Sequence, residues 1–84
     1  MKNYPYHGRK NICGNRVREA RKKRGMTQVD LAAQLQVAEI ILEQDGVSRI
    51  ESGRRFVADY ELKALAKILR VDMLWLVSED DEDI

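Results

Sequence analysis

The sequence predicts an all-α domain of five helices. Apolar residues recur at the three- and four-residue spacing of helices, and no segment alternates between apolar and polar residues as a strand would. With 84 residues, of which 44% are hydrophobic, the chain has room for one domain with one small core. Residues 12–77 are expected to form this domain, between a flexible basic arm over residues 1–11 and an acidic tail over residues 78–84.

The first two predicted helices are bounded by clear signals. The first runs from about Asn15 to Arg24, and Gly25 is placed for a left-handed C-terminal cap. Thr27 starts the second helix, and Asp30 follows it at the spacing of a capping box. The apolar stripe of this second helix consists of Val29, Leu31, Ala32, Ala33 and Leu35.

The middle of the chain combines a long turn with a short helix. The segment Gln36 to Glu43 has no clear cap and is predicted to be an extended turn, with a continuation of the second helix as the alternative. A third helix is predicted from residue 44 or 45 to residue 52, with Val47 and Ile50 buried on one face and Gly53 after its end.

Two further helices complete the domain. Asp59 is expected to cap the fourth helix, and Asp72 is expected to cap a short fifth one. The side chains expected to face inward are Leu62, Leu65, Ala66 and Leu69 in the fourth helix and Met73, Trp75 and Leu76 in the fifth.

Charge is distributed unevenly along the chain. The formal net charge is only +1, yet residues 1–25 hold nine basic residues and one acidic residue, while Glu79 to Asp83 are all acidic. A basic half of this kind is compatible with a nucleic-acid partner despite the near-neutral sum. The alternative is a solvated basic helix at one end and a solubilising tail at the other.

The sequence lacks the residues that several classes of function require. The single Cys13 excludes an internal disulfide and a cysteine-rich zinc site, and His7 has no metal-ligating neighbour at a suitable spacing. No catalytic set and no cofactor motif is present, so we expect neither an enzyme nor a cofactor. The uncharged stretches 31–38 and 73–78 are too short to span a membrane. A soluble, cytoplasmic protein is expected.

Six short strings, in this order, resemble the phage-repressor class of helix-turn-helix domains, often called the Cro or XRE type. They are Gly14–Arg21, Gly25–Gln28, Leu31–Ala32, Val47–Gly53, Leu62–Ala66 and Val71–Leu76. The resemblance implies a lambda-repressor-like fold and a transcriptional regulator that binds double-stranded DNA in a sequence-specific manner. It further implies a repressor that binds a two-fold operator as a homodimer, paired through the fourth and fifth helices.

The resemblance also implies roles for individual residues. Gln28, after the Thr27 cap, would hold a DNA phosphate at a helix N-terminus. The third helix would lie in the major groove, with Arg49 placed for guanine and Gln44 for adenine. Arg21 and Glu51 match a structural ion pair. The full set of DNA-binding candidates is Thr27, Gln28, Gln44, Asp45, Ser48, Arg49, Ser52, Arg54 and Arg55.

The segment between the second and third helices is longer than in that family. Its apolar Ile40, Ile41 and Leu42 are expected to seal the space between the two helices, with a surface for a protein partner as the alternative. Glu43 and Asp45 add carboxylates that repel phosphate. A protein-interaction module on the same fold, such as an antitoxin, an anti-repressor or an assembly adaptor, is therefore the alternative function.

Overall fold

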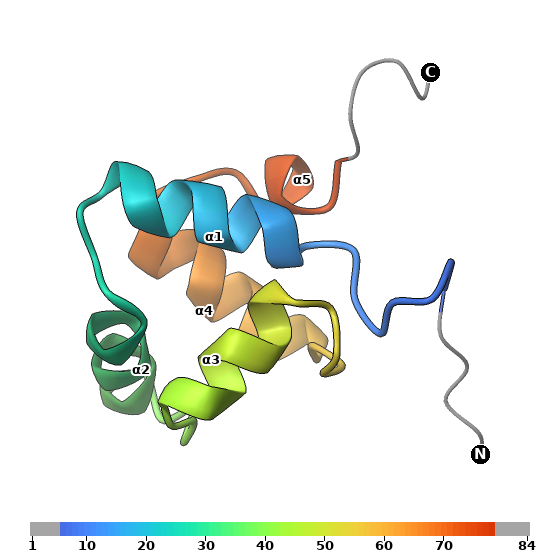
Figure 1. Ribbon diagram of the computed structural model, residues 1–84. Helices are drawn as coiled ribbons and strands as arrows, with labels where there is room; N and C mark the ends of the chain where they lie inside the picture. The colour runs from blue at the N-terminus through green and yellow to red at the C-terminus, as the bar shows by residue number, and fades with distance from the viewer. Residues whose placement is uncertain (1–5, 79–84) are drawn as a thin grey trace.

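The computed structural model describes residues 6–78, and over this range the chain forms five helices and no strand beyond one isolated bridge between Tyr6 and Arg9 (Figure 1). The helices are α1 (Gly14–Lys23), α2 (Gln28–Val37), α3 (Gln44–Glu51), α4 (Asp59–Leu69) and α5 (Met73–Leu76). The prediction of an all-α fold with five helices is confirmed. None of the helices in the described range is both long and apolar enough to cross a membrane.

Two details of the helix boundaries differ from the prediction. α2 continues to Val37, so the extended turn is confined to residues 38–43. Ala58, and not Asp59, is the N-cap of α4, because the Glu61 carboxylate reaches back and accepts a hydrogen bond from the Ala58 N–H at 2.9 Å. Asp59 is therefore the first residue of α4, and the capping hydrogen bond at this end is the one between the Ala58 N–H and the carboxylate of the third helical residue.

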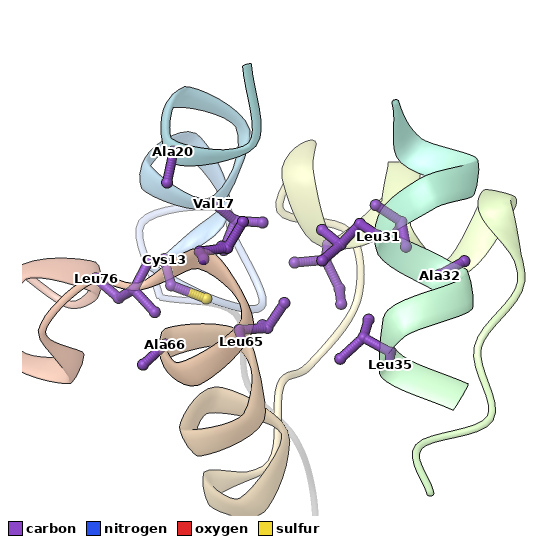
Figure 2. Close-up of a cluster of buried hydrophobic side chains, with 12 residues drawn as sticks. Cys13, Val17, Ala20, Leu31, Ala32, Leu35, Leu65, Ala66 and Leu76 are labelled. Atoms are coloured by element: carbon purple, nitrogen blue, oxygen red, sulfur yellow. The ribbon is translucent and has the colours of Figure 1, made fainter. Parts of the chain in front are cut away.

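α3 lies against both α1 and α2, α4 packs against α1 and α2, and α5 packs against α1 and α4 (Figure 1). Side chains from all five helices meet in one core, where Val17 of α1, Leu31 of α2 and Leu65 of α4 point toward a common interior (Figure 2). The buried apolar residues are Cys13, Val17, Ala20, Leu31, Ala32, Leu35, Val47, Ile50, Leu65, Ala66, Leu69 and Leu76.

Three residues of the predicted apolar stripes face solvent instead. Val29 and Ala33 are exposed, because each lies two residues from the buried Leu31 and thus about 200° around the helix from it. Met73 is also exposed, since Leu76 is the buried side chain of the four-residue helix α5. α2 is thus apolar on two faces, of which one is in the core.

The extended turn leaves α2 through a left-handed residue that is not glycine. Glu39 has a φ of 68°, and the N–H of the following Ile40 donates to the Leu35 carbonyl at 2.9 Å, which is the long hydrogen bond of a Schellman motif. Ile40 and Leu42 then pack against the core, whereas Ile41 is 75% exposed. The expected sealing of the space between α2 and α3 therefore involves Ile40 and Leu42 but not Ile41.

Candidate nucleic-acid interface

α3 turns one side into the core and the other toward solvent. Val47 and Ile50 are buried as predicted, and Gly46 is buried as well, because Leu42 of the extended turn lies where a side chain of residue 46 would be. Of the four side chains predicted to contact bases, Gln44, Asp45 and Arg49 are exposed and Ser48 is half-buried. The structure thus brings these four residues together on one helix.

A buried ion pair joins α1 to the end of α3. Arg21 Nε donates to Glu51 Oε2 at 2.6 Å and Arg21 Nη2 donates to Glu51 Oε1 at 3.1 Å, with the two residues 8% and 6% exposed. Arg21 Nη1 also donates to the Met26 carbonyl at 2.8 Å. The hydrogen bonds to Glu51 raise the pKa of Arg21 above its ordinary value, against the opposing effect of burial. The guanidinium is therefore a fixed part of the fold.

Gln28 extends this pair into a network that spans the length of α3. Its Nε2 donates to Glu51 Oε1 at 3.1 Å, and its Oε1 accepts a hydrogen bond from Gln44 Nε2 at 3.2 Å. The first residue of α2 therefore contacts both the first and the last residue of α3. Sequence patterns do not predict this link, because a hydrogen bond between two amide side chains leaves no periodic signal.

Thr27 holds the N-terminus of α2 in a capping box. Its hydroxyl accepts a hydrogen bond from the Asp30 N–H at 3.0 Å, and its own N–H donates to Asp30 Oδ2 at 2.8 Å. The hydrogen bonds from Thr27 lower the pKa of the Asp30 carboxyl. The predicted capping box is therefore present.

Positive side chains gather at the C-terminal end of α3. A shallow hollow there is lined by Lys10, Arg49, Arg54, Arg55 and Phe56, which together are called the basic end surface below. The Lys10 ammonium lies 5.6 Å from the centroid of the Phe56 ring. Arg54 Nε donates to the exposed Ser52 hydroxyl at 3.3 Å. Ser52, Arg54 and Arg55 are thus together, and Lys10 and Phe56 join them without having been predicted.

The arginines of this surface differ in how strongly they are paired. Arg55 donates twice to Glu61, from Nη1 at 3.0 Å and from Nη2 at 3.1 Å, and these hydrogen bonds raise its pKa. Burial tends to raise the pKa of Glu61, but the hydrogen bonds from Arg55 and Ala58 outweigh it, so this pKa is lowered. The ion pair between Arg49 and Asp45, at 3.5 Å, is exposed and weak. Arg49 is therefore much the freer of the two.

The last residues of the predicted arm are attached to this end of α3. Asn11 Nδ2 donates to the carbonyls of Ile50, at 3.0 Å, and Arg55, at 2.7 Å, while Asn11 Oδ1 accepts from the Gly14 N–H at 2.8 Å. Arg9 Nη2 donates to the Glu51 carbonyl at 3.5 Å. Residues 9–11 of the predicted flexible arm are therefore attached to the fold, because side chains of Arg9 and Asn11 satisfy backbone groups at the end of α3 and the start of α1, while residues 1–5 of the arm lie outside the described range. An Asn three residues before a helix was the signal available.

The opposite end of α3 is acidic. Glu43 and Asp45 are exposed there, and Glu43 is the N-cap residue but makes no capping hydrogen bond with its side chain. Glu39, at the start of the extended turn, is exposed as well. Carboxylates at a helix N-terminus interact favourably with the helix dipole, yet they repel phosphate. The two ends of α3 thus present opposite charges to a partner.

Residues 6–78 give little evidence for a metal site or for a reactive cysteine. Over this range no three His, Cys, Asp or Glu side chains lie together as possible metal ligands. Cys13 is a buried free cysteine, and burial raises the pKa of its thiol, which disfavours the reactive thiolate.

A family model described as a helix-turn-helix domain matches residues 13–73, which span α1 to the start of α5. No curated protein and no solved structure matches the chain. The matched segment contains α2, the extended turn and α3, with the buried pair and the polar face described above. The chain therefore belongs to the helix-turn-helix domain family, which supports DNA as its partner.

Proposed function

We propose that this protein is a sequence-specific transcriptional regulator of the phage-repressor, XRE-type class, acting as a repressor on double-stranded DNA. The proposal rests mainly on the interactions that fix the position of α3 against the rest of the domain. A buried ion pair, Arg21–Glu51, and the Gln28 amide fix a short helix whose opposite side is polar and exposed. A helix fixed by the core with exposed polar side chains is suited to the major groove.

Base contacts are assigned to the exposed side of α3. Arg49 breaks a weak surface pair with Asp45 at little cost, and its guanidinium can then donate two hydrogen bonds to guanine. Gln44 offers an amide for adenine, and Ser48 and Asp45 lie on the same face.

Phosphate contacts are assigned to two places beside that face. Gln28 lies at the N-terminus of α2, which Thr27 caps, and a second hydrogen on its amide nitrogen is available for a phosphate. At the far end of α3, Ser52, Arg54 and Arg55 belong to the basic side of the interface, and Lys10 adds a further charge.

Two copies on a two-fold operator would place their α3 helices about 34 Å apart, one turn of DNA. Exposed apolar side chains on the last two helices support pairing there. Leu74 and Met73 of α5 and Tyr60 of α4 are exposed. A Leu74→Glu variant is expected to keep its fold and to lose affinity for a duplex with two half-sites.

The proposal is tested by selecting bound duplexes from a random pool and measuring fluorescence anisotropy on the selected sequence and on a scrambled one. We expect salt-sensitive binding that favours the selected sequence. Arg49→Ala is expected to cost about 1–3 kcal/mol and to relax base preference, whereas Lys63→Ala, an equal charge change on α4, leaves the preference intact. Equal affinity for the scrambled duplex would defeat the proposal.

A protein-interaction module on the same fold is the second candidate. The observation that favours it is the exposure of apolar side chains at the end of α2 and in the extended turn, since Val37 is 85% exposed and Ile41 is 75% exposed. For such a module, Gln28→Ala and Arg49→Ala would leave partner binding intact, while Ile41→Glu would abolish it.

A further inference from the structure

The proposed function leaves one prominent feature of the chain without a role. Six residues follow Ser78, and the first five of them, Glu79 to Asp83, are all acidic. These five residues are called the acidic run below. A regulator that binds phosphates gains nothing directly from such a concentration of negative charge, so its position relative to the basic residues matters.

The chain enters the acidic run beside the basic end surface. Val77 lines a hollow together with Lys10 and Phe56, and both of these residues also line the basic end surface. The Ser78 carbonyl is 3.5 Å from Arg16 Nε, at the first turn of α1. Six residues of extended chain reach about 20 Å, so the acidic run can lie across this surface without any change in residues 6–78.

The charges of the two parts are complementary. No acidic residue lines the hollow of the basic end surface, and within residues 6–78 neither Lys10 nor Arg54 has a carboxylate partner. A second groove with basic residues lies between α1 and the α4–α5 turn, but Glu19 and Asp72 line it as well. A third hollow, lined by Arg24, Lys67 and Arg70 among others, has no acidic residue either, but it shares no residue with the hollow that Val77 lines. The basic end surface is therefore the better match for five carboxylates that begin just after Ser78.

We propose that the acidic run docks on the basic end surface of its own chain and there competes with DNA phosphates. This inference rests on the proposed function for its consequence, but the docking itself involves no DNA. Carboxylates accept charge-assisted hydrogen bonds from the same donors that hold phosphate oxygens. Because the run is tethered, its effective concentration at the surface is in the millimolar range, and DNA must expel it before binding.

The test compares the full chain with a full-length variant in which the acidic run is neutral. Its substitutions are Glu79→Gln, Asp80→Asn, Asp81→Asn, Glu82→Gln and Asp83→Asn. Amide chemical shifts are first compared without DNA. We expect differences at residues 9–10 and 49–57 that disappear at about 0.5 M salt, where screening is strong. Differences centred on Lys23, Arg24 and Arg70, or an absence of differences, would overturn the docking.

The second measurement is the dissociation constant for a random-sequence duplex. We expect the neutral variant to bind about tenfold more tightly, because the tethered competitor is gone. A matched background separates docking from a general effect of net charge. In Lys10→Gln/Arg54→Gln protein, neutralising the run is expected to change affinity by less than about twofold, since the two charges of the surface that have no carboxylate partner within residues 6–78 have been removed. An equal gain in both backgrounds would overturn the proposal in favour of long-range repulsion.

The two proposals can fail separately. If the chemical shifts change as expected but neither protein binds duplex at low salt, the docking stands and the DNA-binding function falls. If both proteins bind the selected duplex equally well and the shifts are identical, the function stands and the docking falls.

Discussion

The two ends of α3 are held by different kinds of interaction. At the N-terminal end, the buried contacts are apolar, with Leu42 against Gly46 and Ile40 in the core, and the hydrogen bond from Gln44 to Gln28 is exposed. At the C-terminal end, polar groups attach the helix, through the Arg21–Glu51 pair and the Asn11 amide. A helix of eight residues is not stable by itself, so both attachments are needed to set its direction.

The same two ends differ in charge, and this bears on how DNA would approach. The N-terminal end carries Glu43 and Asp45, whereas the C-terminal end carries Arg54 and Lys10. Carboxylates can accept a hydrogen bond from cytosine but are repelled by phosphate. In the proposed complex, these charges favour the DNA backbone beside Lys10 and Arg54, beyond the end of α3, while Gln44 in its first turn and Arg49 in its last turn face the bases.

The largest effect is expected from breaking the polar attachment. Glu51→Ala leaves the buried Arg21 guanidinium without its carboxylate and is expected to lower the free energy of unfolding by about 3–5 kcal/mol. Urea denaturation followed by circular dichroism measures this loss. The control is Asp45→Ala, which breaks an exposed pair and is expected to cost less than about 1 kcal/mol. Similar losses in the two variants would mean that burial of the pair does not matter.

A smaller loss is expected at the same end when the Asn11 side chain is removed. Asn11→Ala leaves the carbonyls of Ile50 and Arg55 and the Gly14 N–H without their partners, at a cost of about 1–3 kcal/mol. Thermal denaturation detects the change, with Asn15→Ala, an exposed position in α1, as the control. An unchanged melting temperature would show that water replaces the amide fully.

A gain in stability is expected at the other end. Glu39 has a positive φ, which costs a residue with a side chain about 1 kcal/mol relative to glycine. Glu39→Gly is therefore expected to raise the free energy of unfolding by about that amount in urea denaturation. Glu39→Gln removes the charge but keeps the positive φ. An equal rise in the free energy of unfolding of Glu39→Gln would therefore point to charge repulsion instead of backbone strain.

The smallest effect is a pH dependence at the loop after α3. The pKa of Glu61 is lower in the folded chain than its ordinary value of 4.5, so folding is stabilised above that value. This stability is lost as the pH falls through the folded pKa. Urea midpoints measured between neutral and acidic pH are expected to show this fall in the unmodified chain and a shallower one in Glu61→Gln. Identical slopes would contradict the role given to the Arg55–Glu61 pair.

Local signals in the sequence were sufficient for much of the fold. Apolar spacing predicted the five helices and the burial of Val47 and Ile50, and the Thr27–Asp30 spacing predicted the cap of α2. These features depend on residues close together in the chain, where periodicity and capping chemistry apply directly. Val29 was misplaced because α2 is apolar on two faces, and spacing alone does not say which face is buried.

Contacts between distant residues were harder to predict. Gln28 bridging Glu51 and Gln44 requires three polar side chains from two helices to meet, and no spacing rule encodes that. Arg55 was considered with the phosphate-binding loop because its charge is visible in the sequence, while its bidentate partner Glu61 is visible only in the structure. The predicted set of DNA-binding residues otherwise stays a prediction that the variants above can test.

The burial of Cys13 gives the chain an internal reporter of its own opening. It is the single cysteine of the sequence, is 2% exposed, and packs where α1, α4 and α5 meet (Figure 2). A thiol reagent can reach it only in molecules whose core has transiently opened, so the labelling rate follows the population of those molecules. A ligand that binds the folded form but not the opened one would slow labelling in proportion to its occupancy.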